Sequence, residues 1–154
     1  MGCLTLAGIA WAQTSKPLGK QEHEVGGVEV TLLELKRTSG DTVTARWSYA
    51  NKTKEPKQLT QERTGWIDPY RLSRNAYLAE GTNRVKYEVM TDTDRRPIAS
   101  RNGTPNKFIF VAPGQTVTVW AKFQAPPANV NKVTVMIDGV APFEDVPIAP
   151  AEQP

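Results

Sequence analysis

The stretch Phe108-Ile-Phe-Val-Ala-Pro-Gly-Gln-Thr-Val-Thr-Val-Trp-Ala-Lys-Phe-Gln-Ala-Pro-Pro127 decides the fold class. It holds two runs in which apolar and polar residues alternate, and a period of two is typical of β-strands with one buried face. Between the runs lies Pro113-Gly114. Proline presets φ for the first central position of a type II turn, and glycine accepts the positive φ of the second. The stretch therefore predicts strands over residues 108–111 and 116–123, separated by a tight turn.

Strand patterns of the same kind recur along most of the chain. The doubled Leu32-Leu33 shifts the phase of one of them and indicates a bulge or burial on both faces. We find no amphipathic helix of convincing length, so the sequence predicts an all-β fold, an immunoglobulin-like antiparallel β-sandwich of seven to eight strands over residues 26–148. No cysteine is available there for a disulfide between the sheets, and we expect Trp47 or Trp120 to fill that space. The further strand patterns cover residues 28–35, 42–50, 76–79, 85–90, 133–137 and 141–148.

The N-terminal residues indicate export. Residues 4–12 form a short apolar run that ends in Ala10-Trp11-Ala12, and small residues at this place are typical of signal peptides. We predict that residues 1–12 are a signal peptide truncated at its basic front, and that the protein is periplasmic or extracellular. Cys3, the single cysteine, would be removed with it. The alternatives are a core strand, a remnant of an expression tag, or a lipid anchor at Cys3.

Length and composition indicate one domain. The 154 residues, 39% of them hydrophobic and 23% charged, suffice for one core and are too few for two ordinary domains. We expect residues 13–25 to be a flexible N-terminal segment and residues 149–154 a disordered tail. An apolar run as short as residues 4–12 does not span a bilayer, so no transmembrane segment is expected in the mature form. The net charge of +3 is too small to indicate a nucleic-acid partner.

Several segments together carry a resemblance to a known family. Residues 77–100, Ala112-Pro-Gly114, residues 120–127 and Pro142-Phe-Glu-Asp-Val-Pro-Ile148 resemble exported bacterial immunoglobulin-like domains, which occur alone in secreted proteins or beside OmpA-type peptidoglycan-binding domains. The resemblance extends over residues 25–148 and implies a non-enzymatic binding or accessory role. These residues contain no OmpA-type module, so it does not imply peptidoglycan binding.

Few residues are suited to metal binding. His23 is the single histidine, which excludes a site built from several histidines. We expect it to be a solvated residue of the N-terminal tail. Asp92 and Asp94 have a spacing found in calcium loops, but Arg95-Arg96 follows where further oxygen ligands are needed. A polar turn is the favoured interpretation. Glu144-Asp145 is interpreted as an exposed acidic strand end, with a cation site as the alternative.

Catalytic motifs are also missing from the sequence. We find no phosphate-binding loop and no nucleophile elbow, and a single histidine leaves little room for a catalytic triad. We therefore predict no catalytic residues, no metal and no cofactor. The alternative is a hydrolase or other enzyme with an unfamiliar carboxylate site around Asp68, Glu88 and Asp92.

The strongest functional signal is a basic stretch in the middle of the chain. Residues 52–107 hold 12 lysines and arginines against seven aspartates and glutamates, with aromatic residues among them. Arginine beside aromatic side chains can bind anionic or sugar-containing polymers. We predict a binding or assembly module of the cell envelope, whose partner is an envelope protein or an anionic envelope polymer; a solvated basic rim is the alternative. The candidate binding residues are Trp66, Tyr70, Arg71, Arg74, Arg84, Arg95 and Arg96.

Overall fold

The protein is all-β. The computed structural model describes residues 16–60, 68–81, 84–102 and 108–152. Within these ranges it contains ten β-strands, all paired antiparallel, which confirms the prediction of an all-β antiparallel fold. Two short strands without a sequence signal, at residues 19–22 and 57–58, bring the number above the expected seven to eight. The described part of the chain has no helix that could cross a membrane, and the predicted signal peptide lies outside it.

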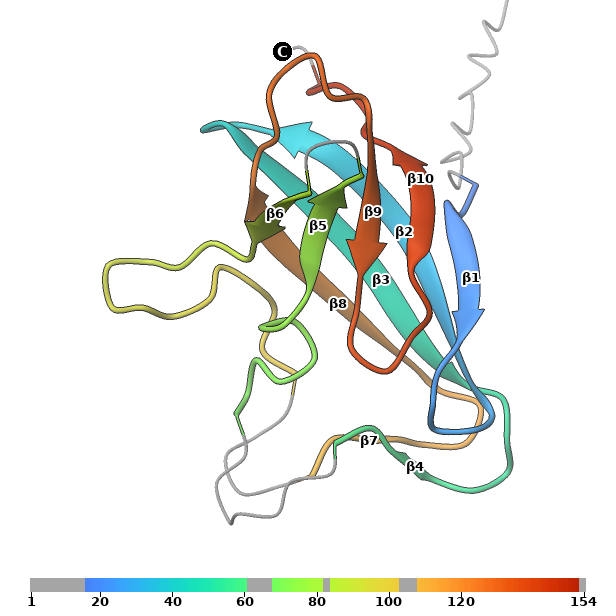
Figure 1. Cartoon of the computed structure of the whole chain (residues 1–154). Coiled ribbons are helices and arrows are strands. Elements are labelled where there is room, and N and C mark those ends of the chain that lie inside the picture. Colours follow the sequence, from blue (N-terminus) through green and yellow to red (C-terminus); the bar gives the residue numbers. More distant parts are fainter. Residues whose placement is uncertain (1–15, 61–67, 82–83, 103–107, 153–154) are drawn as a thin grey trace, which may run out of the picture.

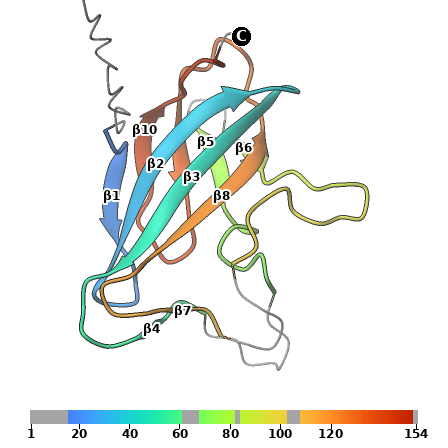
Figure 2. The same ribbon diagram turned by 180° about the vertical axis from the view of Figure 1, so that it is seen from behind.

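Two four-stranded sheets form the two layers of the molecule (Figure 1). Figure 2 shows the first sheet from its outer side. A separate two-stranded ladder lies at one end of the layers. The first sheet has the order β1 (Gly19–Glu22), β2 (Val28–Thr38), β3 (Thr42–Asn51) and β8 (Thr116–Gln124). The second has the order β10 (Phe143–Pro147), β9 (Lys132–Met136), β5 (Tyr77–Glu80) and β6 (Val85–Glu88), and the ladder joins β4 (Lys57–Gln58) to β7 (Phe110–Val111).

The hydrophobic core is built from both sheets. Alternate positions of β3 point inward, so that Trp47 is fully buried, while Trp120 on β8 keeps 38% of its surface exposed. Of the two tryptophans, Trp47 is therefore the one that fills the core. The pairing of β2 with β3 shifts register between Leu32 and Glu34, which confirms the predicted bulge. The remaining fully buried large side chains are Tyr49, Phe123, Leu32, Leu35, Leu78, Val28, Val30, Val43, Val111, Val119 and Val135.

The predicted Pro113-Gly114 turn is present. The N–H of Gln115 donates to the carbonyl of Ala112 at 3.0 Å, and Gly114 has a φ of 68°. These are the features of a type II turn. The two strands around it have different partners, because β7 pairs with β4 whereas β8 pairs with β3. The turn thus leads the chain from the small ladder into the first sheet.

The expectation of a flexible segment over residues 13–25 is wrong for its second half. β1 pairs with β2, and His23 forms a β-bridge with Val140. This strand carries no apolar face and is held by backbone hydrogen bonds, which hydrophobic periodicity does not reveal. At the other end, the N–H of Ala149 donates to the carbonyl of Leu35 at 2.9 Å. An isolated β-bridge therefore holds Ala149, the first residue of the segment 149–154, which we expected to be disordered.

After β6 the chain crosses from the second sheet to the first. Val89 pairs with Phe123 of β8, and Ala99 pairs with Ala121. The N–H of Lys122 donates to the carbonyl of Ile98, and the N–H of Ser100 donates to the carbonyl of Trp120, both at 2.9 Å. Residues 91–97 project sideways between these contacts (Figure 1). The crossing segment thereby fixes part of the basic stretch along the edge of β8.

Candidate functional site

A short turn at residues 68–74 places an aromatic ring beside an arginine. The carboxylate of Asp68 accepts the backbone N–H of Tyr70 at 2.9 Å. The backbone N–H of Arg74 donates to the carbonyl of Tyr70 at 2.8 Å. The same Asp68 carboxylate binds the guanidinium of Arg74, through Nε and, at 3.3 Å, through Nη2. Asp68 therefore stabilises the turn and also fixes the direction of Arg74.

Two arginines from different segments meet at the Tyr70 ring. The guanidinium carbons of Arg74 and Arg101 each lie 5.9 Å from the ring centroid. Arg101 is brought there by the backbone, since the N–H of Asn102 donates to the carbonyl of Pro69 at 2.8 Å. A cation–π contact at an exposed site contributes about 0.5–1 kcal/mol. Tyr70 thus orients two cationic groups.

These side chains line a hollow of about 400 Å³, which we call the Tyr70 hollow. Arg96 joins it from the projecting turn 91–97, where the Asp92 carboxylate accepts the backbone N–H groups of Asp94 and Arg96 at 2.9 Å. Among the described residues, no carboxylate pairs with the guanidinium of Arg96 or of Arg101. The hollow therefore has an excess of positive charge. Its lining residues are Asp68, Pro69, Tyr70, Arg74, Arg96 and Arg101.

The structure brings together three of the seven predicted binding residues, namely Tyr70, Arg74 and Arg96. It adds Arg101, which we did not select. Arg101 belongs to the same basic stretch, but no local pattern distinguishes it from the other arginines there. Only the backbone contact between residues 69 and 102 reveals its place.

The other predicted binding residues lie elsewhere. Nη1 of Arg71 is 3.8 Å from Oδ2 of Asp138, in a different hollow. Arg84 lies in the turn between β5 and β6, and Arg95 on the projecting turn, with positive φ values of 53° and 61°. Neither side chain lines the Tyr70 hollow. Trp66 lies outside the described residues.

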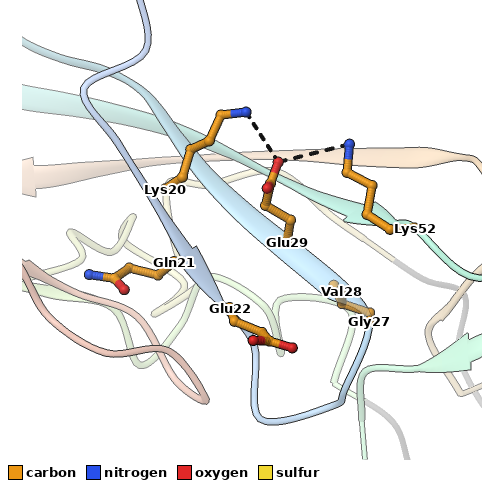
Figure 3. A pocket seen from close by; sticks show the side chains of 7 residues that line it. All are labelled: Lys20, Gln21, Glu22, Gly27, Val28, Glu29 and Lys52. Carbon is orange, nitrogen blue, oxygen red and sulfur yellow. Dashed lines mark hydrogen bonds and ion pairs between the residues drawn. The ribbon is translucent and has the colours of Figure 1, made fainter.

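Another hollow, between β1 and β2, is less suited to a charged ligand. Oε1 of Glu29 lies 3.3 Å from Nζ of Lys20 and 3.8 Å from Nζ of Lys52. Figure 3 shows Glu29 between the two lysines. Glu22 also lines this hollow, so that its lining holds two lysines and two glutamates. The charges of the hollow between β1 and β2 balance, whereas those of the Tyr70 hollow do not. We therefore take the Tyr70 hollow as the candidate site.

The carboxylates of the enzyme alternative do not meet. Asp68 binds Arg74, whereas Oε1 of Glu88 lies 3.2 Å from Nζ of Lys86 on exposed β6. Asp92 accepts backbone N–H groups within its own turn, as expected for a polar turn. These three residues therefore do not form the shared pocket that this alternative requires. Within the described ranges, no group of three histidine, cysteine, aspartate or glutamate side chains could hold a metal ion.

His23 is buried, and the expectation of a solvated tail residue is wrong. Only 6% of its surface is exposed, because β1 carries it onto the sandwich. Its Nδ1 accepts the N–H of Val25 at 3.0 Å, and its ring meets the Tyr49 ring edge-on, with 5.7 Å between centroids. Burial lowers the pKa of His23, while the negative charge of Glu24 opposes this shift.

We expect acidification to destabilise the fold through His23. The pKa of His23 in the folded state lies below the value of 6.5 for an unperturbed histidine. Above pH 6.5, His23 is neutral in both states and does not lower the free energy of unfolding. As the pH falls from there toward the folded-state pKa, the free energy of unfolding decreases by at most about 1.4 kcal/mol per pH unit. Urea unfolding at several values between about pH 7.5 and pH 5.5 measures this slope. With a single histidine in the chain, His23→Gln should flatten it, and an unchanged slope in the variant would contradict the assignment.

Comparisons of the chain with models of protein families, with curated protein sequences and with solved structures found no match. Membership of the exported immunoglobulin-like domains therefore stays a prediction from the sequence. The Tyr70 hollow is therefore the feature of the molecule from which a function can be inferred.

Proposed function

We propose that this protein is an exported immunoglobulin-like binding module of the cell envelope, without catalytic activity, and that the Tyr70 hollow is its contact site. The partner is an envelope protein or an anionic envelope polymer. One observation carries the proposal: Arg96 and Arg101 both line the hollow, and no carboxylate among the described residues neutralises either of them. Charged groups arranged in this way favour a partner of opposite charge.

The order of the strands supports the immunoglobulin-like part of the proposal. In an immunoglobulin constant domain, strands A, B, E and D form one sheet and strands C, F and G form the other. With β2 as strand A, the neighbours β2, β3 and β8 correspond to A, B and E, and β5, β9 and β10 correspond to C, F and G. The segment 98–100 pairs with β8 where strand D is expected.

The apolar run of residues 4–12, with Ala10-Trp11-Ala12, supports export.

Capture of the partner from envelope extract tests the contact site. The double variant Arg96→Ala/Arg101→Ala should recover at least about tenfold less partner than the native chain, because each charge-assisted contact contributes about 1.5–3 kcal/mol. Recovery by the native chain should also fall with increasing salt. The matched control is Arg84→Ala/Arg95→Ala, which removes the same charge outside the hollow and should behave like the native chain. Equal losses in both double variants would show that overall charge, not the Tyr70 hollow, holds the partner.

A further inference from the structure

We propose that the Tyr70 hollow recognises a phosphate group. This inference rests on the proposed function and names the chemical group that its contact site binds. Arg96 and Arg101 are the direct ligands, since neither guanidinium has a carboxylate partner among the described residues. Tyr70 is a positioning residue for Arg101, which lies over its ring, whereas Asp68 holds Arg74 on the other side of the same hollow.

The charge of the hollow matches a phosphate better than a carboxylate. Among the described residues, its lining contains three arginines and one aspartate, and that aspartate is bound to Arg74. Two positive charges thus remain in excess, and a phosphate monoester carries about −1.5 to −2 at pH 7. A guanidinium forms two parallel hydrogen bonds to one oxyanion. One bidentate arginine engages both oxygens of a carboxylate, so that a second arginine must share them, whereas a phosphate offers further oxygen atoms to a second arginine.

The side chain of Arg101 and the backbone turn that carries Arg96 are held in place before any ligand arrives. Arg101 lies against the Tyr70 ring, and its neighbour Asn102 is bonded to Pro69. Arg96 belongs to a turn that the Asp92 carboxylate stabilises through two backbone N–H groups. The turn is attached to β8 on both sides. Ordering flexible side chains costs affinity, so this arrangement favours binding of a small anion.

Titration with inorganic phosphate tests the proposal. At low ionic strength and neutral pH, the amide resonances of residues 68–74 and 95–102 should shift in a saturable way, with a Kd of about 1 mM. The affinity should fall at least about tenfold in Arg96→Ala and in Arg101→Ala, and stay unchanged in Arg84→Ala/Arg95→Ala. Acetate is the comparison anion and should bind more weakly. Equal affinity for acetate, or phosphate affinity that survives both substitutions, would overturn the proposal.

The positioning role of Tyr70 has its own readout. Tyr70→Leu keeps a large apolar side chain but removes the ring that faces Arg74 and Arg101. Phosphate binding should weaken, and Tyr70→Phe should restore it because the ring alone makes these contacts. Weak binding in the phenylalanine variant would instead assign a direct role to the hydroxyl group. Circular dichroism and urea unfolding of each variant show whether the fold is kept.

Two further probes distinguish the sources of the phosphate group. Vesicles of phosphatidylcholine with phosphatidic acid present it as a lipid headgroup, and short-chain polyphosphate presents it on a soluble polymer. Dependence of either interaction on Arg96 and Arg101 supports the proposal and identifies the source. If partner capture requires both arginines but no phosphate compound binds, the phosphate inference fails and the binding module stands. If phosphate binds but the Arg96→Ala/Arg101→Ala variant recovers as much partner as the native chain, the Tyr70 hollow is not the contact site of the proposed function.

Discussion

Replacing Trp47 by alanine should lower the free energy of unfolding by about 3–5 kcal/mol, the usual cost of removing a buried tryptophan. The side chain is fully buried, and its Nε1–H donates to the Tyr49 hydroxyl at 3.2 Å. The substitution leaves a cavity between the sheets and removes the hydrogen-bond partner of a buried tyrosine. Since small domains are stable by only about 5–15 kcal/mol, this is a large fraction of the total.

Trp120→Ala is the matched control for this prediction. Trp120 lies on the outer face of β8 with 38% of its surface exposed. We expect it to cost about 1 kcal/mol, because removing a part-exposed side chain leaves no closed cavity. Urea unfolding followed by circular dichroism measures both variants on one scale. Similar losses would mean that Trp47 is not the centre of the core.

Asn51→Ala should destabilise the protein by about 2–4 kcal/mol, because it removes the partner of one buried carbonyl and of several part-buried polar groups. Only 1% of the Asn51 surface is exposed. Its Nδ2 donates to the carbonyls of Glu55 at 2.7 Å and Val111 at 2.9 Å. Its Oδ1 accepts the backbone N–H of Thr53 at 2.9 Å and the Thr53 hydroxyl at 2.7 Å. Asn51 therefore joins the end of β3 to the ladder of β4 and β7.

Hydrogen exchange can locate this effect. The N–H of Leu59 donates to the carbonyl of Ile109 at 2.8 Å, next to the ladder. It should exchange faster in Asn51→Ala, whereas amides at the centre of β3 should change only with global stability. Asn75→Ala is the control, since Asn75 is exposed and bonds only to Asp138 among the described residues. A loss as large in the control would contradict a special role for Asn51.

Much of the fold could be predicted from local sequence patterns. Trp47 and Tyr49 alternate with polar residues in a way that defines the buried face of β3. Leu32-Leu33 indicated the bulge, and Pro113-Gly114 indicated the turn. Each of these signals arises within a few consecutive residues. Backbone geometry and hydrophobic burial act at that range, so they are visible without the tertiary structure.

Features that depend on distant contacts could not be predicted in this way. β1 is polar and exists because β2 offers a backbone edge to it, and His23 is buried as a result. In the candidate site, the spacing of Tyr70 and Arg74 is local. Arg101 reaches the same ring only through the crossing of the chain onto β8. Charge counting pointed to the basic stretch 52–107 but could not separate Arg96 and Arg101 from their neighbours.

The crossing of residues 89–100 onto β8 also has a consequence for solubility. β8 is the last strand of the first sheet, and this segment covers part of its free edge. Uncovered edge strands pair with strands of other chains and start aggregation. Arg96 and Arg101 lie on either side of residues 98–100, so a ligand that bridges them holds the cover in place by mass action. If the proposed ligand binds there, occupancy of the Tyr70 hollow would be thermodynamically linked to protection of this edge.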